Sequence, residues 1–201
     1  MRIALFGTVG AGKSTMSEIL SKKLNAEIFP EPVDNNPYFD DYYRDMPNFI
    51  FKMQIWMLTA RSRQLIHAMD IKNVIFDRTI LEDPIFVQVN HDLKRMNDID
   101  FQTYNNFYNE VVLPSLQERA NFDVVVYLRL SAEKSIERIV ERGRPQEVAA
   151  DHSYWELLNK RYEDFYQKNK NKFNFLVIDA ENDNLEKKAS EVIEHLKKLT
   201  K

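Results

Sequence analysis

Residues 7–15 of this chain read GTVGAGKST, which fits the spaced pattern G-x-x-x-x-G-K-[ST]. Glycines let a loop turn its backbone N–H groups inward around anionic oxygens, a lysine adds positive charge, and a serine hydroxyl can ligate Mg²⁺. The pattern therefore predicts a phosphate-binding loop. Its predicted members are Gly7, Thr8, Val9, Gly10, Ala11, Gly12, Lys13, Ser14 and Thr15.

The residues around this loop supply the context that the motif needs. The apolar run Ile3–Phe6 predicts a buried strand before it, and Lys13–Leu24 predicts a helix after it. The same cradle occurs in GTPase switches, ATPases and small-molecule kinases. An N-K-x-D guanine-reading tetrapeptide is absent between Asn97 and the C-terminus, which argues against a Ras-type GTPase.

A glutamate follows the second predicted strand. Glu31 stands after Glu27–Phe29, between two prolines that stiffen the turn. A carboxylate in this place, facing the γ-phosphate, can accept a proton from a hydroxyl nucleophile. An exposed loop glutamate is the alternative, but the nearby phosphate loop favours a general base.

The tripeptide Asp77-Arg78-Thr79 ends the third predicted strand. An acid in this place is predicted to hold Mg²⁺, directly or through water, together with the hydroxyl of Ser14. Arg78 is predicted to bind a substrate oxygen or a phosphate. A helix N-cap is the alternative for Asp77 and Thr79, but it leaves the arginine unexplained.

Three arginines gather in the segment RIVERGRPQE. Arg138 and Arg142 are four residues apart on one predicted helix face, and a glycine and a proline then place Arg144 on a loop. Such arginines can close over a phosphate site as a movable lid, predicted here at about residues 141–150. Arg138 is assigned to the nucleotide, and Arg142 and Arg144 to the transferring phosphate. A solvated helix end with surface ion pairs is the alternative.

The order of the predicted elements indicates an α/β fold. Short continuous apolar runs alternate with longer amphipathic segments, which is typical of a parallel sheet covered on both faces by helices. We predict one P-loop kinase domain over residues 1–201, a doubly wound sheet of about five strands with ligands at the carboxyl ends of the strands. The predicted strands are 3–6, 27–29, 74–76, 124–128 and 175–178, and the predicted helices are 13–24, 48–68, 83–93, 101–119, 132–141, 154–169 and 185–199.

The composition limits the class of protein. The 201 residues are 44% hydrophobic, which is enough for a substantial core, and the net charge of −3 does not favour a nucleic-acid polymer as partner. Because there is no cysteine, disulfides, thiolate metal sites and a cysteine nucleophile are excluded. The apolar run in MRIALFG is too short for a secretory signal, and no run is long enough to span a bilayer. We therefore expect a soluble cytoplasmic protein without a membrane partner.

Four motifs together resemble those of the deoxyribonucleoside kinase family, which includes the deoxycytidine, deoxyguanosine and mitochondrial thymidine kinases. They are GTVGAGKST, EPV at 31–33, DRT at 77–79 and RGRPQE at 142–147. The family usually has D/E-R-S in place of DRT, a difference that keeps the hydroxyl. The chain is similar along nearly its whole length to bacterial deoxyadenosine kinases of the mycoplasma type. The resemblance implies that ATP, with Mg²⁺, phosphorylates the 5′-hydroxyl of a deoxynucleoside in nucleotide salvage.

The resemblance also implies roles for individual residues. Glu31 matches the general base that takes the proton of the 5′-hydroxyl, and Arg78 matches the arginine that holds the same oxygen. Asp77 matches the acid near Mg²⁺. Tyr43 and Glu147 match the pair that grips the 3′-hydroxyl, since a phenol and a carboxylate can together bond one hydroxyl.

Further residues match the positions that read the base. Gln54, Arg61 and Asp83 are implied as readers, and Phe86 or its neighbour Val87 as the side chain that stacks on the base. Thymidine-preferring relatives tend to have apolar residues where Arg61 and Asp83 stand, so these two residues favour a purine or cytosine. The resemblance implies deoxyadenosine, with deoxyguanosine and deoxycytidine second. The helices that carry these residues resemble those through which the family forms dimers, so we also expect a homodimer.

Two other functions compete with this interpretation. A nucleoside monophosphate kinase of the thymidylate kinase kind shares the loop, a D-R pair and the lid, but it has an arginine just before the glutamate. Here that residue is Pro30, and Glu31 would repel an incoming phosphate dianion. A non-enzymatic nucleotide switch is the other alternative, and the absent guanine reader counts against it.

Overall fold

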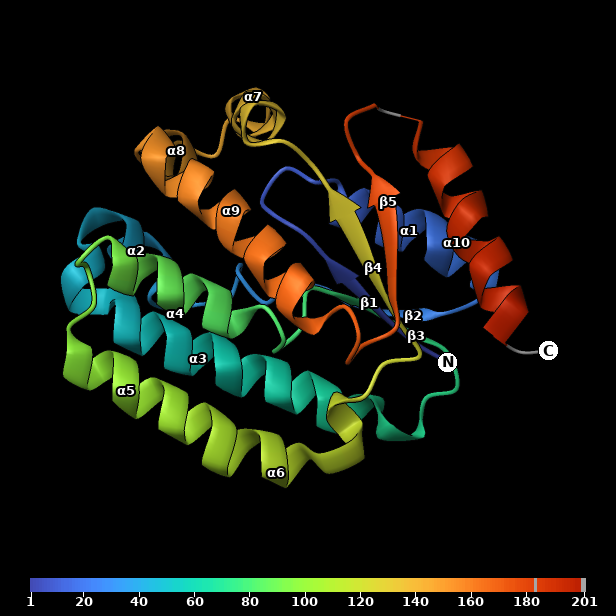
Figure 1. The fold of residues 1–201 in the computed structure, drawn as a ribbon, viewed down its shortest axis with the longest axis horizontal. Coiled ribbons are helices and arrows are strands. Elements are labelled where there is room, and N and C mark those ends of the chain that lie inside the picture. The colour runs from blue at the N-terminus through green and yellow to red at the C-terminus, as the bar shows by residue number, and fades with distance from the viewer. Residues whose placement is uncertain (183, 200–201) are drawn as a thin grey trace.

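The computed structural model describes residues 1–182 and 184–199. A five-stranded sheet in the order β2-β3-β1-β4-β5 forms its centre, and every neighbouring pair is parallel (Figure 1). This arrangement confirms the predicted α/β class and number of strands. The strands are β1 (Arg2–Phe6), β2 (Glu27–Phe29), β3 (Val74–Asp77), β4 (Val124–Arg129) and β5 (Phe175–Asp179).

Helices cover both faces of the sheet, which explains why its strands are continuous apolar runs. On β1, Ile3 and Leu5 pack in one core cluster while Ala4 and Phe6 pack in another. The first cluster lies under α1 (Lys13–Leu24) and α10 (Leu185–Leu199). The opposite face is covered by α3, α4 and α9, seen on the other side of the sheet in Figure 1. These helices are α3 (Met46–His67), α4 (Asp83–Asp92) and α9 (His152–Asn169).

Two helical segments differ from the predictions. The helix predicted over 101–119 is present within a helical segment over 98–120, but it is not one regular α-helix, because the segment passes through a π-helical turn. Pro114 has no N–H for the regular i to i−4 series, and the chain turns at Gln117 with φ 48°. The segment consists of α5 (Asp98–Asn106), η2 (Phe107–Val112), α6 (Leu113–Leu116) and η3 (Gln117–Ala120).

A short helix, α2 (Phe39–Arg44), was not predicted at all. It packs against α3 and carries two adjacent tyrosines, Tyr42 and Tyr43, the first of which is buried. The remaining short elements are η1 (Ala68–Asp70), α7 (Ala132–Arg142) and α8 (Pro145–Val148). Gly143, with φ 69°, ends α7, and Arg144 precedes α8 in extended backbone.

The sheet register brings the functional loops to one edge. Leu5 of β1 pairs with Asp77 of β3, and Phe6 pairs with Tyr127 of β4. The loops that follow β1, β2 and β3 therefore leave the same edge side by side, where an α/β sheet binds its ligands. Within residues 1–182 and 184–199, no helix combines the length and apolar character needed to cross a membrane.

Candidate active site

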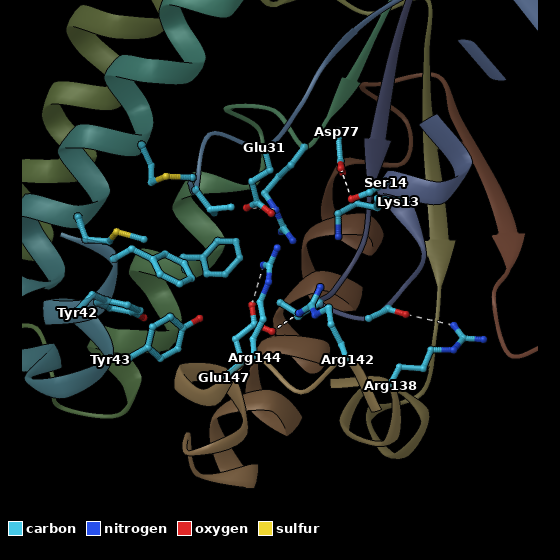
Figure 2. Close-up of a pocket in the computed structure, with 18 of the residues that line it drawn as sticks. Lys13, Ser14, Glu31, Tyr42, Tyr43, Asp77, Arg138, Arg142, Arg144 and Glu147 are labelled. Carbon is cyan, nitrogen blue, oxygen red and sulfur yellow. Dashed lines mark hydrogen bonds and ion pairs between the residues drawn. The ribbon is translucent and has the colours of Figure 1, made fainter. Parts of the chain in front are cut away.

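A cavity of about 390 Å³ opens at this edge of the sheet (Figure 2). Its volume is within the range of small-molecule sites. The phosphate-binding loop, Glu31, α2, α3, the end of β3 and the arginine segment all contribute to its wall. The predicted site residues that line it are Val9, Gly10, Gly12, Lys13, Ser14, Thr15, Glu31, Tyr43, Gln54, Arg61, Asp77, Arg78, Phe86, Arg138, Arg142, Arg144 and Glu147. Four other predicted residues lie outside this lining: Gly7, Thr8, Ala11 and Asp83.

The phosphate-binding loop has the geometry that its glycines predict. Gly7 has φ 145°, and a Cβ there would lie 2.7 Å from the carbonyl oxygen of Leu128 on β4. The Nζ of Lys13 donates to the carbonyl oxygens of Gly7 and Thr8 at 2.8 and 2.9 Å. Burial, followed by the charge of Arg78, lowers the pKa of Lys13 to about 8. The loop thus encloses a cation that an incoming phosphate would stabilise.

Helix α7 supports the same loop from behind. Ser135 donates its hydroxyl to the carbonyl oxygen of Val9 at 2.7 Å. Arg138 donates to the carbonyl oxygens of Gly10 at 3.2 Å and Ala180 at 3.0 Å. Its guanidinium therefore ties the phosphate-binding loop to the segment that follows β5, beside the cavity (Figure 2).

The residues predicted to hold Mg²⁺ meet each other. The hydroxyl of Ser14, at the start of α1, donates to the carboxylate of Asp77 at the end of β3. A hydroxyl and a carboxylate are hard oxygen donors, and protein Mg²⁺ sites commonly use one or two carboxylates together with substrate phosphates. The pair therefore fits a Mg²⁺ ion held jointly with phosphate. In the described part of the chain, no group of three or more His, Asp or Glu residues could hold a metal without such help.

Glu31 is held between two arginines. Its Oε1 lies 2.7 Å from Nε of Arg78 and 3.1 Å from Nη2 of Arg61. The loop that carries it is fixed by Gln64 of α3, which donates to the carbonyl oxygen of Pro30 at 2.7 Å. Burial raises the pKa of Glu31, but the charges of Arg78 and Arg61 outweigh burial and lower this pKa below its usual range. The cavity therefore contains an ionised carboxylate.

Arg78 has an unusual backbone conformation. Its φ is 77°, and non-glycine residues in that region cost about 1–2 kcal/mol. The side chain is 2% exposed, and its Cζ lies 5.0 Å from the centre of the Phe86 ring. The next residue, Thr79, accepts a hydrogen bond from the N–H of Leu81 at 3.2 Å, so its hydroxyl stabilises the turn into α4.

The predicted base-reading residues divide into two layers. Gln54, Arg61 and Phe86 line the cavity, whereas Asp83 is fully buried and forms an ion pair with Arg61. One carboxylate oxygen of Asp83 and the Nε of Arg61 have no hydrogen-bond partner among the described residues. Val87 is fully buried in a core cluster and does not line the cavity, so of these two neighbours only Phe86 is placed to contact a ligand there.

The arginine segment folds back onto one carboxylate. Glu147, at 4% exposure, forms ion pairs with both Arg142 and Arg144, the latter at 3.2 Å (Figure 2). Tyr43 of α2 lies on the same side of the cavity, and its pKa is raised well above its usual range by burial, and further by Tyr42 and Glu147. The two residues predicted to grip a 3′-hydroxyl thus share one wall of the cavity.

Several lining residues were not predicted as members of the site. Met53 and Met57 lie on the face of α3 that also carries Arg61, so the helical spacing of four could have indicated them. Tyr42 and Tyr154 also line the cavity, with their hydroxyls 3.0 Å apart. Tyr154 is distant from the other site residues in the sequence, and no local pattern marks it. The other unpredicted lining residues are Val33 and Phe39.

The chain is similar to proteins of one known family along nearly its whole length. A family model described as deoxynucleoside kinase matches residues 3–201. The structure of an M. mycoides deoxyadenosine kinase with the products dCMP and a flexible dCDP bound is 52% identical, with a TM-score of 0.92. The comparison covers 98% of this chain and 100% of that one. The structure of the M. mycoides enzyme with bound dATP is 53% identical with a TM-score of 0.90, at the same coverage.

Other relatives are less similar in sequence, but they are also deoxynucleoside kinases. The deoxyadenosine/deoxycytidine kinase of Bacillus subtilis is 34% identical over 165 residues, which cover 81% of this chain and 75% of the relative. A deoxyguanosine kinase of Lactobacillus acidophilus is 34% identical over 171 residues, with coverage of 83% and 75%. These matches favour neither a nucleoside monophosphate kinase nor a nucleotide switch.

Proposed function

The chain belongs to the deoxynucleoside kinase family and is an ATP-dependent phosphotransferase, and on that premise we propose that it phosphorylates the 5′-hydroxyl of deoxyadenosine. Deoxyguanosine and deoxycytidine would be secondary substrates. The observation that carries the proposal is the ionised carboxylate of Glu31, held by Arg61 and Arg78 in the cavity that the phosphate-binding loop also lines. Such a carboxylate suits a neutral hydroxyl as acceptor, because it would repel an acceptor that already carries a phosphate.

The donor ATP would bind to the phosphate-binding loop, with the whole segment from Gly7 to Thr15 shaping the cradle. Lys13 would turn from the carbonyl oxygens it now contacts toward the β- and γ-phosphates. Ser14 and Asp77 would hold Mg²⁺, which supplies charge neutralisation on the phosphates. Arg138 would remain at the edge of the nucleotide site, where it ties the loop to the segment after β5.

The acceptor would bind beside Glu31. The carboxylate removes the proton of the 5′-hydroxyl, the oxygen attacks the γ-phosphorus, and the bond to the bridging oxygen of ADP breaks. Arg78 holds the attacking oxygen in place. Arg142 and Arg144 leave Glu147 and stabilise the charge that spreads over the transferring phosphoryl group, so the arginine segment acts as a lid.

The sugar and base would be recognised by residues of the cavity wall away from the phosphate-binding loop. Tyr43 and Glu147 bond the 3′-hydroxyl, and Phe86 stacks on the base. Gln54 reads the base edge directly, and Arg61 does so with Asp83 behind it. This polar set suits adenine and cytosine, which present an amino group, whereas thymine presents a carbonyl oxygen and a methyl group. The related enzymes named for deoxyadenosine support the choice of adenine.

The test is a panel of deoxyadenosine, deoxyguanosine, deoxycytidine, thymidine and deoxyadenosine monophosphate, each assayed with ATP and Mg²⁺. We expect the highest kcat/KM for deoxyadenosine and very slow reaction of thymidine and of the monophosphate. The proposal fails if thymidine reacts as well as deoxyadenosine, or if the monophosphate is the better acceptor.

We further propose that the chain forms a homodimer through its long helices. A surface groove on α3 is lined by Ile55 and Trp56 among others, and Phe107 and Val111 are exposed on the neighbouring helical segment. Apolar side chains that are left exposed on helices favour association with another protein surface. Sedimentation equilibrium of the parent should give twice the chain mass. The substitutions Trp56→Glu and Val111→Glu should lower the measured mass to that of one chain.

A further inference from the structure

Glu82 is a fully buried carboxylate that contacts two functional loops at once. Its Oε1 accepts a hydrogen bond from the backbone N–H of Gly7 at 3.1 Å and lies 3.4 Å from Nη1 of Arg78. Its Oε2 accepts from the backbone N–H of Thr79 at 3.3 Å. Glu82 therefore joins the start of the phosphate-binding loop to the turn that follows β3.

The guanidinium of Arg78 is held from two sides. Glu31 pairs with its Nε, and Glu82 lies at its Nη1, which also donates to the hydroxyl of Tyr162 on α9. The ring of Tyr162 and the ring of Phe86 both lie close to the guanidinium carbon, at 5.9 and 5.0 Å. This surrounding structure also maintains the positive φ of Arg78, because strained conformations persist only where neighbours determine them.

Glu82 does not line the cavity, so it is not placed to touch a substrate. A buried carboxylate is costly unless charges and hydrogen bonds compensate it. Here the compensating groups are Arg78 and the backbone N–H of Thr79 from the acceptor side of the site, and the backbone N–H of Gly7 from the donor side. Glutamate at this position thus fixes the spatial relation between those two sides.

We propose that Glu82 is a positioning residue for phosphoryl transfer, which holds Arg78 at a fixed place relative to the phosphate-binding loop. This inference rests on the proposed role of Arg78 at the 5′ oxygen. The in-line approach of that oxygen to the γ-phosphorus requires Arg78 and the phosphate-binding loop to keep a fixed relative position. A misplacement of about 1 Å can cost on the order of 10²-fold in rate. Glu82 acts through Arg78 and Gly7, without contact to either substrate.

The test starts with Glu82→Gln, which keeps the shape but removes the charge and places an amide donor among N–H donors. We expect kcat with deoxyadenosine to fall about 10–100-fold, while KM for deoxyadenosine and for ATP changes by less than about 3-fold. The matched control is Glu163→Gln. Glu163 accepts hydrogen bonds from Arg129 and Tyr127, so it too is paired with an arginine, but it lies outside the cavity. Its kcat should match that of the parent.

A double-mutant cycle with Arg78→Ala separates positioning from general stability. If Glu82 acts through Arg78, Glu82→Gln should lower kcat little further in the Arg78→Ala background. The inference is overturned if Glu82→Gln lowers kcat by the same factor in the parent and in the Arg78→Ala variant. It is also overturned if Glu82→Gln keeps the parental kcat. If Arg78→Ala alone keeps the parental kcat, the proposed role of Arg78 fails first, and with it this inference.

Tyr162→Phe provides a second variant in case Glu82→Gln does not fold. It retains the ring and the carboxylate but removes the hydroxyl that Arg78 bonds. We expect kcat to fall by about 3–10-fold, again with little change in KM, and the loss to vanish in the Arg78→Ala background. An unchanged kcat in folded Tyr162→Phe would contradict the proposed support of Arg78.

Discussion

The Nε of Arg78 lies 2.7 Å from Oε1 of Glu31, at the edge of the sheet where the phosphate-binding loop begins. The same carboxylate oxygen faces Nη2 of Arg61, so Glu31 lies between two buried cations, which also pair with Asp83 and Glu82. This relationship keeps Glu31 ionised and fixes its direction. It also links base reading, through Arg61, to the proton transfer that we assign to Glu31.

The pH dependence of activity follows from that arrangement. Burial raises the pKa of Glu31, but the charges of Arg78 and Arg61 lower this pKa by more than burial raises it. The pKa of Glu31 therefore lies below the ordinary value of about 4.3. A base works only when ionised, so the acid limb of kcat/KM for deoxyadenosine should lie below that value. The ionised group also stabilises the folded state above the ordinary pKa, and that contribution is lost as pH falls through the lowered one.

The double variant Arg61→Met with Asp83→Ala tests this pH prediction. It removes one of the two cations beside Glu31, so the acid limb should move to higher pH. Kinetics should be restricted to the pH range in which circular dichroism shows a folded protein. An acid limb at the same pH in parent and variant would show that Glu31 does not control it.

The same double variant tests the choice of base. Because Arg61 also pairs with Glu31, the change should slow reaction with every nucleoside, and the informative quantity is the ratio of two kcat/KM values. We expect the preference for deoxyadenosine over thymidine to fall by more than 10-fold, since the polar mismatch with thymine is removed. A ratio equal to that of the parent would exclude Arg61 and Asp83 as readers of the base.

The assignment of the phosphate-binding loop predicts that a substitution of its lysine weakens ATP binding selectively. Lys13→Ala should weaken ATP binding and slow transfer, because it removes the charge at the β- and γ-phosphates, whereas deoxyadenosine alone should still bind. Calorimetry with each ligand separately provides the measurement. Lys22→Ala, an exposed lysine on the same helix, is the matched control. Parental ATP affinity and turnover in Lys13→Ala would contradict the assignment of the loop.

The lid arginines should act mainly in the transition state. Arg142→Ala and Arg144→Ala should lower kcat more than they raise KM for deoxyadenosine, because these side chains close over the transferring phosphate. Arg44→Ala removes an arginine that is 75% exposed and serves as the control. If both lid variants lose only thermal stability and keep parental kinetics, the surface-charge interpretation of this segment is correct.

The parts of the site that are continuous in sequence could be predicted from it. The phosphate-binding loop is set by glycines whose φ values only they adopt readily, and the strand before it is apolar because both its faces are buried. The contact between Ser14 and Asp77, the residues predicted to hold Mg²⁺, required only the order of strands, since Leu5 and Asp77 are neighbours in the sheet. Local chemistry and parallel topology together account for this success.

The parts that depend on tertiary packing could not be predicted in the same way. Helix α2 is only six residues long, so periodicity offers no signal, yet it carries Tyr43. Glu82 resembles an ordinary acidic residue before a helix, and its sequence position does not reveal its hydrogen bond from Gly7, which is 75 positions away. The meeting of Arg61 with Glu31 likewise joins residues 30 positions apart.

The most direct measurement of the central claim is single-turnover phosphoryl transfer by Glu31→Gln, with ATP, Mg²⁺ and saturating deoxyadenosine. Glutamine keeps the shape of the side chain and removes the proton acceptor, so the rate should fall about 10²–10⁴-fold. ATP affinity should change little, and Glu27→Gln, an exposed glutamate on β2, should react at the parental rate. A rate for Glu31→Gln within a few-fold of the parent would contradict the assignment of Glu31 as the base.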